Sequence, residues 1–263
     1  MIKKIFSKII PFIYLFSKRK IKKYNKQIKI NQLNLNFKSR NAKYKYFHHY
    51  FWNIAPEWLR KHRKYFSQNQ RGFGEDAFHA MWYFIFNEFK PKNILEIGIY
   101  RGQTLSLFAL LSKKFNINTN IHGISPFASV GDSVSKYLEN IDYYSDVKKN
   151  FAYFNLKPPF FHKGLSTAKA MINLIQSQKW DLIYIDGNHD YEIVKHDFTV
   201  CSKQLNRGGL IVLDDASLYT DYKPSLYSTA GHPGPSKVAL EIDSNLFDEI
   251  LAVGHNRVFR KII

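Results

Sequence analysis

The stretch Ile94-Leu-Glu-Ile-Gly98-Ile-Tyr-Arg-Gly102 decides how this chain folds. An apolar strand ends in a turn with two glycines, and residues 103–115 then show the apolar spacing of a helix. Glycines in such a turn let the backbone approach a ligand closely, and a helix N-terminus favours negative charge. This order predicts the ligand-binding edge of an open α/β sheet, where ligands lie at the carboxyl ends of the strands.

The same alternation continues along the chain and predicts the fold class. Apolar strands alternating with amphipathic helices are typical of a parallel sheet covered on both faces. We therefore expect an α/β fold with a doubly wound, mostly parallel, seven-stranded sheet that is Rossmann-like, with an antiparallel strand in a C-terminal hairpin. Strands are expected at 92–98, 119–124, 159–162, 181–186, 209–213, 249–253 and 257–262. Helices are expected at 54–70, 75–89, 103–115, 135–141, 145–155, 166–178, 191–206 and 236–245.

The net charge of +18 lies almost entirely at the N-terminus. Residues 1–64 hold 18 Lys and Arg against the single acid Glu57, whereas the remaining 199 residues carry a net charge of only +1. This asymmetry predicts a basic extension that meets an anionic surface. We expect residues 1–50 to form a basic amphipathic extension and linker, with 24–50 as a polar linker, and residues 51–263 to form the catalytic domain.

Residues 1–23 place isoleucines and phenylalanines at helical spacing between lysines. The segment is too short and too interrupted to span a membrane, so a helix on an anionic membrane face is one interpretation. A helix packed on the domain, a disordered tail, or an RNA-binding arm that uses Tyr24, Tyr44, Tyr46 and Phe47 are the others. The single cysteine, Cys201, excludes an internal disulfide and a cysteine-based metal cluster. We expect a cytoplasmic protein, with peripheral contact to the inner membrane face and a homo-oligomer left open.

The second diagnostic pattern follows two later strands. Asp186-Gly-Asn-His189-Asp-Tyr-Glu ends the expected strand 181–186, and Gly208-Gly-Leu-Ile-Val-Leu-Asp214-Asp215 ends the next one. Neighbouring parallel strands would bring Asp186, Asp214 and Asp215 to one edge, where three oxygen ligands suit Mg²⁺ or a similar divalent cation. A neutral His189 could take the proton of an alcohol whose pKa the cation lowers. Turn and helix-cap chemistry is the alternative interpretation of each of these residues.

Together the two patterns resemble those of class I S-adenosylmethionine-dependent methyltransferases. The E-x-G-x-x-x-G of the first strand resembles their motif I, and D-G-x-H-x-Y-E followed by G-G-x-I-x-x-D-D resembles the macrocin O-methyltransferase and cephalosporin hydroxylase-like group. The resemblance covers about residues 72–262 and implies S-adenosylmethionine as cofactor. It also implies metal-assisted methylation of a sugar or glycoconjugate hydroxyl, as in polysaccharide biosynthesis. By that resemblance Asp186, Asp214 and Asp215 would hold the metal, and His189 and Asp186 would be catalytic.

The resemblance also assigns the cofactor side of the site. Glu96, Gly98, Gly102 and Thr104 would face S-adenosylmethionine. The chain departs from the pattern at the end of the second strand, where many class I methyltransferases carry an acid for the ribose hydroxyls and this chain has Ser125. We expect Asp132, on the following loop, to substitute for that acid.

Several other segments have weaker signals. Residues 72–76 could help to close the site or only begin a helix, and residues 163–166 could border the adenine. The loop 219–235, which contains His232, could cover the acceptor, because long loops in compact domains are usually functional. His162 and His255 are expected to be structural or surface residues. Two other function classes remain open from the sequence: an NAD-type oxidoreductase, disfavoured by the missing G-x-G-x-x-G, and a nucleic-acid-modifying enzyme or RNA-binding module.

Overall fold

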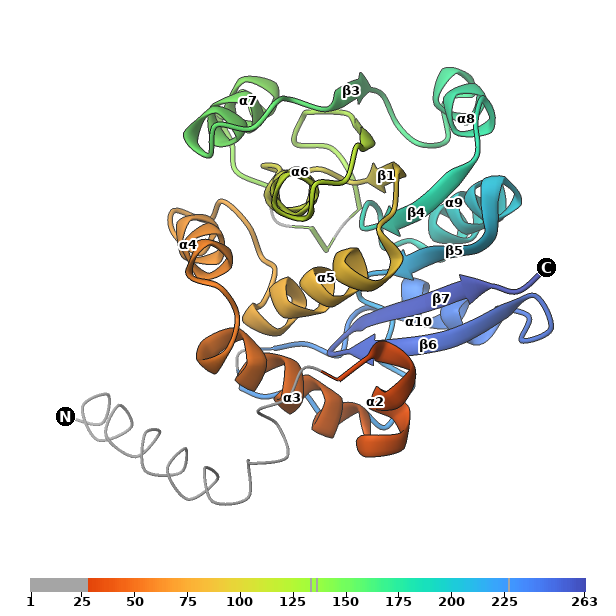
Figure 1. Cartoon of the computed structure of the whole chain (residues 1–263). Helices are drawn as coiled ribbons and strands as arrows, with labels where there is room; N and C mark the ends of the chain where they lie inside the picture. The colour runs from red at the N-terminus through yellow and green to blue at the C-terminus, as the bar shows by residue number, and fades with distance from the viewer. Residues whose placement is uncertain (1–27, 133, 136, 227) are drawn as a thin grey trace.

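The computed structural model describes residues 28–132, 134–135, 137–226 and 228–263, and its centre is one seven-stranded sheet (Figure 1). The strand order is β3-β2-β1-β4-β5-β7-β6, with β7 antiparallel to both of its neighbours and the other neighbouring pairs parallel. The expected fold class is therefore confirmed, including the C-terminal hairpin. The strands are β1 (Asn93–Ile97), β2 (Asn120–Ser125), β3 (Phe160–Lys163), β4 (Trp180–Ile185), β5 (Leu205–Leu213), β6 (Phe247–Val253) and β7 (Asn256–Lys261).

Helices cover both faces of the sheet, and the alternation of side chains along each strand separates two apolar cores. In β1, Ile94 faces one core while Leu95 and Ile97 face the other. The first core packs against α2 (Ile30–Asn36), α3 (Arg40–Asn53), α4 (Glu57–Phe66), α5 (Asp76–Phe89), α6 (Gln103–Phe115) and α7 (Tyr143–Tyr153). The second packs against α8 (Lys169–Gln176), α9 (Tyr191–Gln204) and α10 (Pro233–Leu240).

The expected linker at 24–50 is wrong over most of its length. Residues 30–53 form α2 and α3, which lie against α5 and β6 in Figure 1. Leu33, Tyr46 and Phe47 are fully buried. The segment is polar on average, but these large apolar side chains pack against the rest of the domain. The burial of Tyr46 and Phe47 also removes two of the aromatic residues on which an RNA-binding arm would depend.

Two expected helices are not found among the described residues, for different reasons. In place of a helix at 135–141, the described residues there form turns and irregular backbone, and Asp132 and Tyr143 hold this segment by accepting hydrogen bonds from its backbone amides. The amphipathic helix expected within residues 1–23 lies outside the described residues. Within the described part of the chain, no helix has the length and apolarity needed to cross a membrane.

Candidate active site

The register of the sheet brings four predicted site residues to one level at its carboxyl edge. Ile97 of β1 pairs with Ile124 of β2 and Ile185 of β4, and Ile185 pairs with Leu213 of β5. The residues that follow these four are Gly98, Ser125, Asp186 and Asp214. The sheet geometry therefore confirms that residues far apart in the sequence meet at this edge, as expected for parallel neighbouring strands.

Gly98 is required at this level because the neighbouring strand approaches it closely. Its φ of +95° lies in the left-handed region, and a Cβ atom added there would lie 1.9 Å from the carbonyl oxygen of Asp186. Only glycine fits this combination of backbone angle and contact. The turn after β1 and the end of β4 are thus held against each other.

A cavity of about 970 Å³ opens above this row. Its walls come from the turns that follow β1 to β5, from the start of α5 and from the loop between β5 and α10. Glu96, Gly98 and Ser125 lie toward the β1 and β2 side, whereas Asp214 and Asp215 lie toward the β5 side. One cavity can therefore hold two ligands side by side, with the carboxylates at one end.

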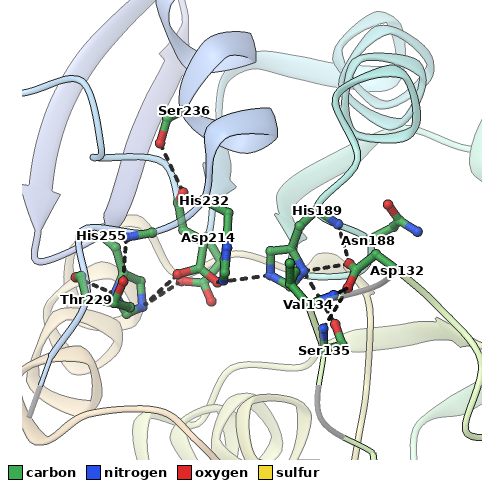
Figure 2. A network of polar contacts seen from close by, with 12 residues as sticks. Asp132, Val134, Ser135, Asn188, His189, Asp214, Thr229, His232, Ser236 and His255 are labelled. Atoms are coloured by element: carbon green, nitrogen blue, oxygen red, sulfur yellow. Dashed lines mark hydrogen bonds and ion pairs between the residues drawn. The ribbon is translucent and has the colours of Figure 1, made fainter.

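His189 stands between two carboxylates, as Figure 2 shows for its Asp132 side. Its Nδ1 atom lies 2.6 Å from Asp132 Oδ2, and its Nε2 atom lies 3.0 Å from Asp215 Oδ2. Asp132 also accepts hydrogen bonds from the backbone amides of His189, Val134 and Ser135. The carboxylate of Asp132 is only 1% exposed, so its oxygens are committed to this network.

These two carboxylates determine the charge of the imidazole. Burial lowers the pKa of His189, but the hydrogen bonds and charges of Asp215 and Asp132 outweigh burial and raise the pKa to about 9. Burial raises the pKa of Asp132, but its hydrogen bonds with Ser135 and His189 lower it to about 2. With no cation bound at Asp215, these contacts favour the charged form of the imidazole.

Asp186 and Asp214 form a largely buried carboxylate pair joined by a hydrogen bond. Burial and the charge of Asp214 hold the pKa of Asp186 well above its usual range. This favours a protonated Asp186 whose hydroxyl donates a hydrogen bond to Asp214. Burial and the same charge raise the pKa of Glu96, whose Oε2 atom has no hydrogen-bond partner among the described residues. Buried acids at this density favour a ligand that brings positive charge.

Two histidines complete this end of the cavity. The backbone amide of His232 donates to Asp215 O at 2.8 Å, and the His232 ring centroid lies 4.4 Å from that of His189. His255 Nε2 lies 3.3 Å from Asp214 Oδ1. Burial lowers the pKa of His255, but the charge of Asp214 outweighs burial and raises the pKa to about 10.

Among the described residues, two groups of three have potential metal-ligand atoms within 4.8 Å of one another. The first is His189, Asp215 and His232, and the second is Asp214, Asp215 and His255. The predicted carboxylate set is therefore brought together only in part. Asp214 and Asp215 converge, while Asp186 belongs to neither group and bonds to Asp214.

Sequence comparison identifies the family. A profile described as a methyltransferase domain matches residues 95–216, which begin in β1 and end just past Asp215. The uncharacterized protein R132 of Acanthamoeba polyphaga mimivirus is 30% identical over 193 residues, covering 70% of this chain and 76% of that protein. The chain belongs to the class I S-adenosylmethionine-dependent methyltransferases.

Solved structures share the fold of this methyltransferase. A putative caffeoyl-CoA O-methyltransferase from Staphylococcus aureus gives a TM-score of 0.57 at 16% identity, over 86% of this chain and 100% of that one. The SAH-bound methyltransferase PaMTH1 of Podospora anserina gives 0.55 at 16% identity, over 80% of this chain and 89% of that one. At these identities the likeness establishes the fold, and the family assignment favours methyl transfer over the oxidoreductase alternative.

Of the six predicted cofactor residues of this methyltransferase, four line the cavity and two do not. Glu96, Gly98, Thr104 and Ser125 line the cavity. Gly102 instead lies at the start of α6, where an added Cβ atom would lie 3.0 Å from Val147 of α7. Asp132 faces His189 and its own turn, so the structure gives no support to its expected role at the ribose.

Sequence reasoning missed His255 and gave His232 only a place in a loop. His255 lies in the turn between β6 and β7, and it reaches the site because β7 runs antiparallel beside β5, pairing Leu213 with Arg257. The start of β7 therefore lies beside the end of β5. A polar Gly-His-Asn turn in the C-terminal hairpin was the only signal in the sequence, and it acquires meaning only once the strand order is known.

Proposed function

We propose that this methyltransferase transfers the methyl group of S-adenosylmethionine to a hydroxyl of a sugar or glycoconjugate, assisted by a divalent cation. One observation carries the proposal: Asp186, Asp214 and Asp215 lie next to the Gly98 turn, within a single cavity of about 970 Å³. A methyl donor and an acceptor hydroxyl can therefore be held together beside a group of carboxylates. Holding reactants in line can supply much of the rate of such a transfer.

The residues at the β4 and β5 ends fit a cation. Asp214 and Asp215 offer oxygen atoms, and Asp186 can add another once its proton is displaced. A divalent cation, when bound, neutralises these carboxylates and lowers the pKa of an acceptor hydroxyl. The buried carboxylates supply the negative charge that such an ion requires.

His189 is the proposed base. Its Nδ1 atom is held by Asp132, which leaves Nε2 directed toward Asp215 and the cavity. A cation held by Asp215 would offset the charge of that carboxylate, so His189 would lose its Nε2 proton to solvent more readily. The neutral Nε2 could then accept the proton of the acceptor hydroxyl. Asp132 keeps the ring in place during this step, because it also binds the backbone amide of His189.

At the acceptor end, polar and apolar groups alternate around the cavity. Ser228 and Thr229 line it beside the carboxylates, and Phe73 lies at its rim with 64% of its surface exposed, packed on Tyr100. Pockets of this type orient a ligand through a few polar groups and hold it through apolar contact. The hydroxyl-bearing residues Ser228 and Thr229 near the carboxylates support a saccharide acceptor, which offers hydroxyl groups for hydrogen bonding.

Two substitutions test the site itself. We expect His189→Ala and Asp214→Asn to abolish turnover, while S-adenosylmethionine binding measured by calorimetry changes less than about tenfold, because both residues lie at the carboxylate end. Asp190→Asn is the matched control, since this exposed neighbour of His189 does not line the cavity. Near-normal turnover in both site variants would refute the assignment.

The acceptor class needs a separate experiment. Glycans and metabolites from cells with and without the gene are compared by mass spectrometry for species that differ by one methylene. Purified full-length protein with S-adenosylmethionine then converts the unmethylated species, with and without chelator. If cells without the gene lack a methyl group on a nucleic acid and on no saccharide, the proposed acceptor class is wrong. The proposed roles of the site residues would then still stand.

A further inference from the structure

We propose that His255 is a nitrogen ligand of the cation, together with Asp214 and Asp215, and that the resident ion is therefore a transition metal ion such as Mn²⁺ or Co²⁺ and not Mg²⁺. This inference rests on the cation of the proposed function and specifies its coordination. His255 is 7% exposed and lines the same cavity as the two carboxylates.

The distances suit a single ion. His255 Nε2 lies 3.3 Å from Asp214 Oδ1 and 3.9 Å from Asp215 Oδ1, and one ligand atom from each of the three residues lies within 4.8 Å of the others. An octahedral ion about 2.1 Å from each donor requires donor separations between about 3 Å and about 4.2 Å. Both distances from His255 fall within this range, so its Nε2 atom and the two carboxylates lie close enough to share one ion.

The ring of His255 is oriented as in a metal ligand. Its Nδ1 atom lies 3.1 Å from the carbonyl oxygen of Thr229, and a carbonyl can only accept, so Nδ1 carries the proton. Once a bound cation displaces the Nε2 proton, the lone pair of the neutral ring would lie on Nε2, facing the carboxylates. Histidines that bind metals nearly always donate their other ring N–H to a carbonyl or carboxylate in this way.

Fixed contacts hold His255 in this orientation. Its carbonyl accepts the backbone amide of Ala216 at 2.8 Å, and its ring packs edge-on against Phe78 with centroids 4.6 Å apart. A ligand positioned before the ion arrives loses little freedom on binding. These contacts therefore hold the His255 ring in the orientation that a metal ligand would need.

A buried oxygen at this position lies 3.3 Å from His255 Nε2 but accepts no hydrogen bond of good geometry. Asp214 Oδ1 is fully enclosed and forms no hydrogen bond with any described residue, although it is the carboxylate atom nearest to His255 Nε2. Buried polar atoms in native proteins are nearly always satisfied. An ion between Asp214 and His255 would satisfy both atoms at once, whereas a simple ion pair with a protonated ring is the competing arrangement.

The donor set determines which ion is preferred. Mg²⁺ favours oxygen ligands and retains several waters, whereas imidazole suits transition metal ions. We expect the metal-free full-length protein to bind Mn²⁺ and Co²⁺ at least tenfold more tightly than Mg²⁺. His255→Gln should weaken Mn²⁺ binding by roughly tenfold or more, and leave Mg²⁺ binding nearly unchanged.

Calorimetric titration with MnCl₂, CoCl₂ and MgCl₂ measures these affinities, with His162→Gln as the control histidine on β3, outside the cavity lining. Pulsed electron paramagnetic resonance of the Mn²⁺-loaded wild-type protein gives a second measurement that needs no variant. Nitrogen hyperfine coupling from a coordinated imidazole is expected, and His255→Gln should remove it.

Each outcome decides between the arrangements. Equal Mg²⁺ and Mn²⁺ affinities without nitrogen coupling would leave an all-oxygen site, so His255 would be only an ion-pair partner while the proposed function stands. Nitrogen coupling that persists in His255→Gln would assign the ligand to another histidine and overturn the inference. Failure of every ion to bind would refute this inference and the cation of the proposed function together.

Discussion

The buried pair His62 and His79 predicts a specific loss of stability in mild acid. His62 Nδ1 lies 3.1 Å from His79 Nε2, and His62 Nε2 lies 3.0 Å from Ser106 Oγ, so the network joins α4, α5 and α6 beside the cavity that His79 lines. Burial, with a contribution from Arg63, lowers the pKa of His62 to about 3, and burial also holds the pKa of His79 well below its usual range. Both rings are therefore neutral in the folded protein at neutral pH.

The sign and size of the effect follow from these values. An unfolded histidine has a pKa of about 6.5, so the unfolded chain takes up protons first as the pH falls. The contribution to stability is complete above that pKa and is lost progressively as the pH falls toward about 3. For His62 alone the loss is about 1.4 kcal/mol at about pH 5.5 and about 2.7 kcal/mol at about pH 4.5.

Urea denaturation at constant ionic strength tests this prediction. The free energy of unfolding is measured from about pH 7.5 to about pH 4.5 for the wild type and for His62→Leu, which cannot titrate at this position. The wild type should lose about 1.4 kcal/mol relative to the variant by about pH 5.5, whatever their difference at neutral pH. His196→Gln, on α9 and outside this network, serves as the control. Parallel curves for wild type and His62→Leu would refute the reasoning.

Three further substitutions test how the site is supported. Gly98→Ala should reduce S-adenosylmethionine affinity by at least tenfold in calorimetry, because its Cβ atom would lie 1.9 Å from the Asp186 carbonyl oxygen; unchanged affinity would contradict the close approach. Asn41→Ala should speed proteolysis within residues 217–232, since Asn41 donates to and accepts from the backbone of Lys223 at 2.5 Å and 2.9 Å; an unchanged cleavage rate would show that the loop is held elsewhere. Arg101→Ala should cost about 3 kcal/mol of unfolding free energy in urea, because it breaks a largely buried ion pair to α7, and a loss below about 1 kcal/mol would mean that solvent screens the pair.

The strand periods and the glycine turn were sufficient to predict the sheet, because alternation and turn chemistry are local properties of the sequence. They also placed Asp186 and Asp214 at one edge, since parallel strands end on the same side. The local reading was wrong for residues 30–53 because the apolar side chains of α2 and α3 are separated by polar ones. Their helical state depends on burial against α5 and β6, which no local pattern reports.

The partners of the catalytic candidates depended entirely on tertiary structure. Asp132 was expected at the cofactor ribose, but it binds His189, which lies 57 residues further along the chain. His255 was expected to be structural, but an antiparallel last strand brings it beside Asp214.

The sequence by itself thus determined the fold class, the family motifs and the edge of the sheet where the candidate site lies, because these depend on spacing along one strand or turn. Only the tertiary structure decided which histidine meets which carboxylate, and therefore which rings carry charge and which atoms can hold an ion. Those properties depend on distances of 3 to 4 Å between separate elements, and the strand order that creates them is not written in any single motif.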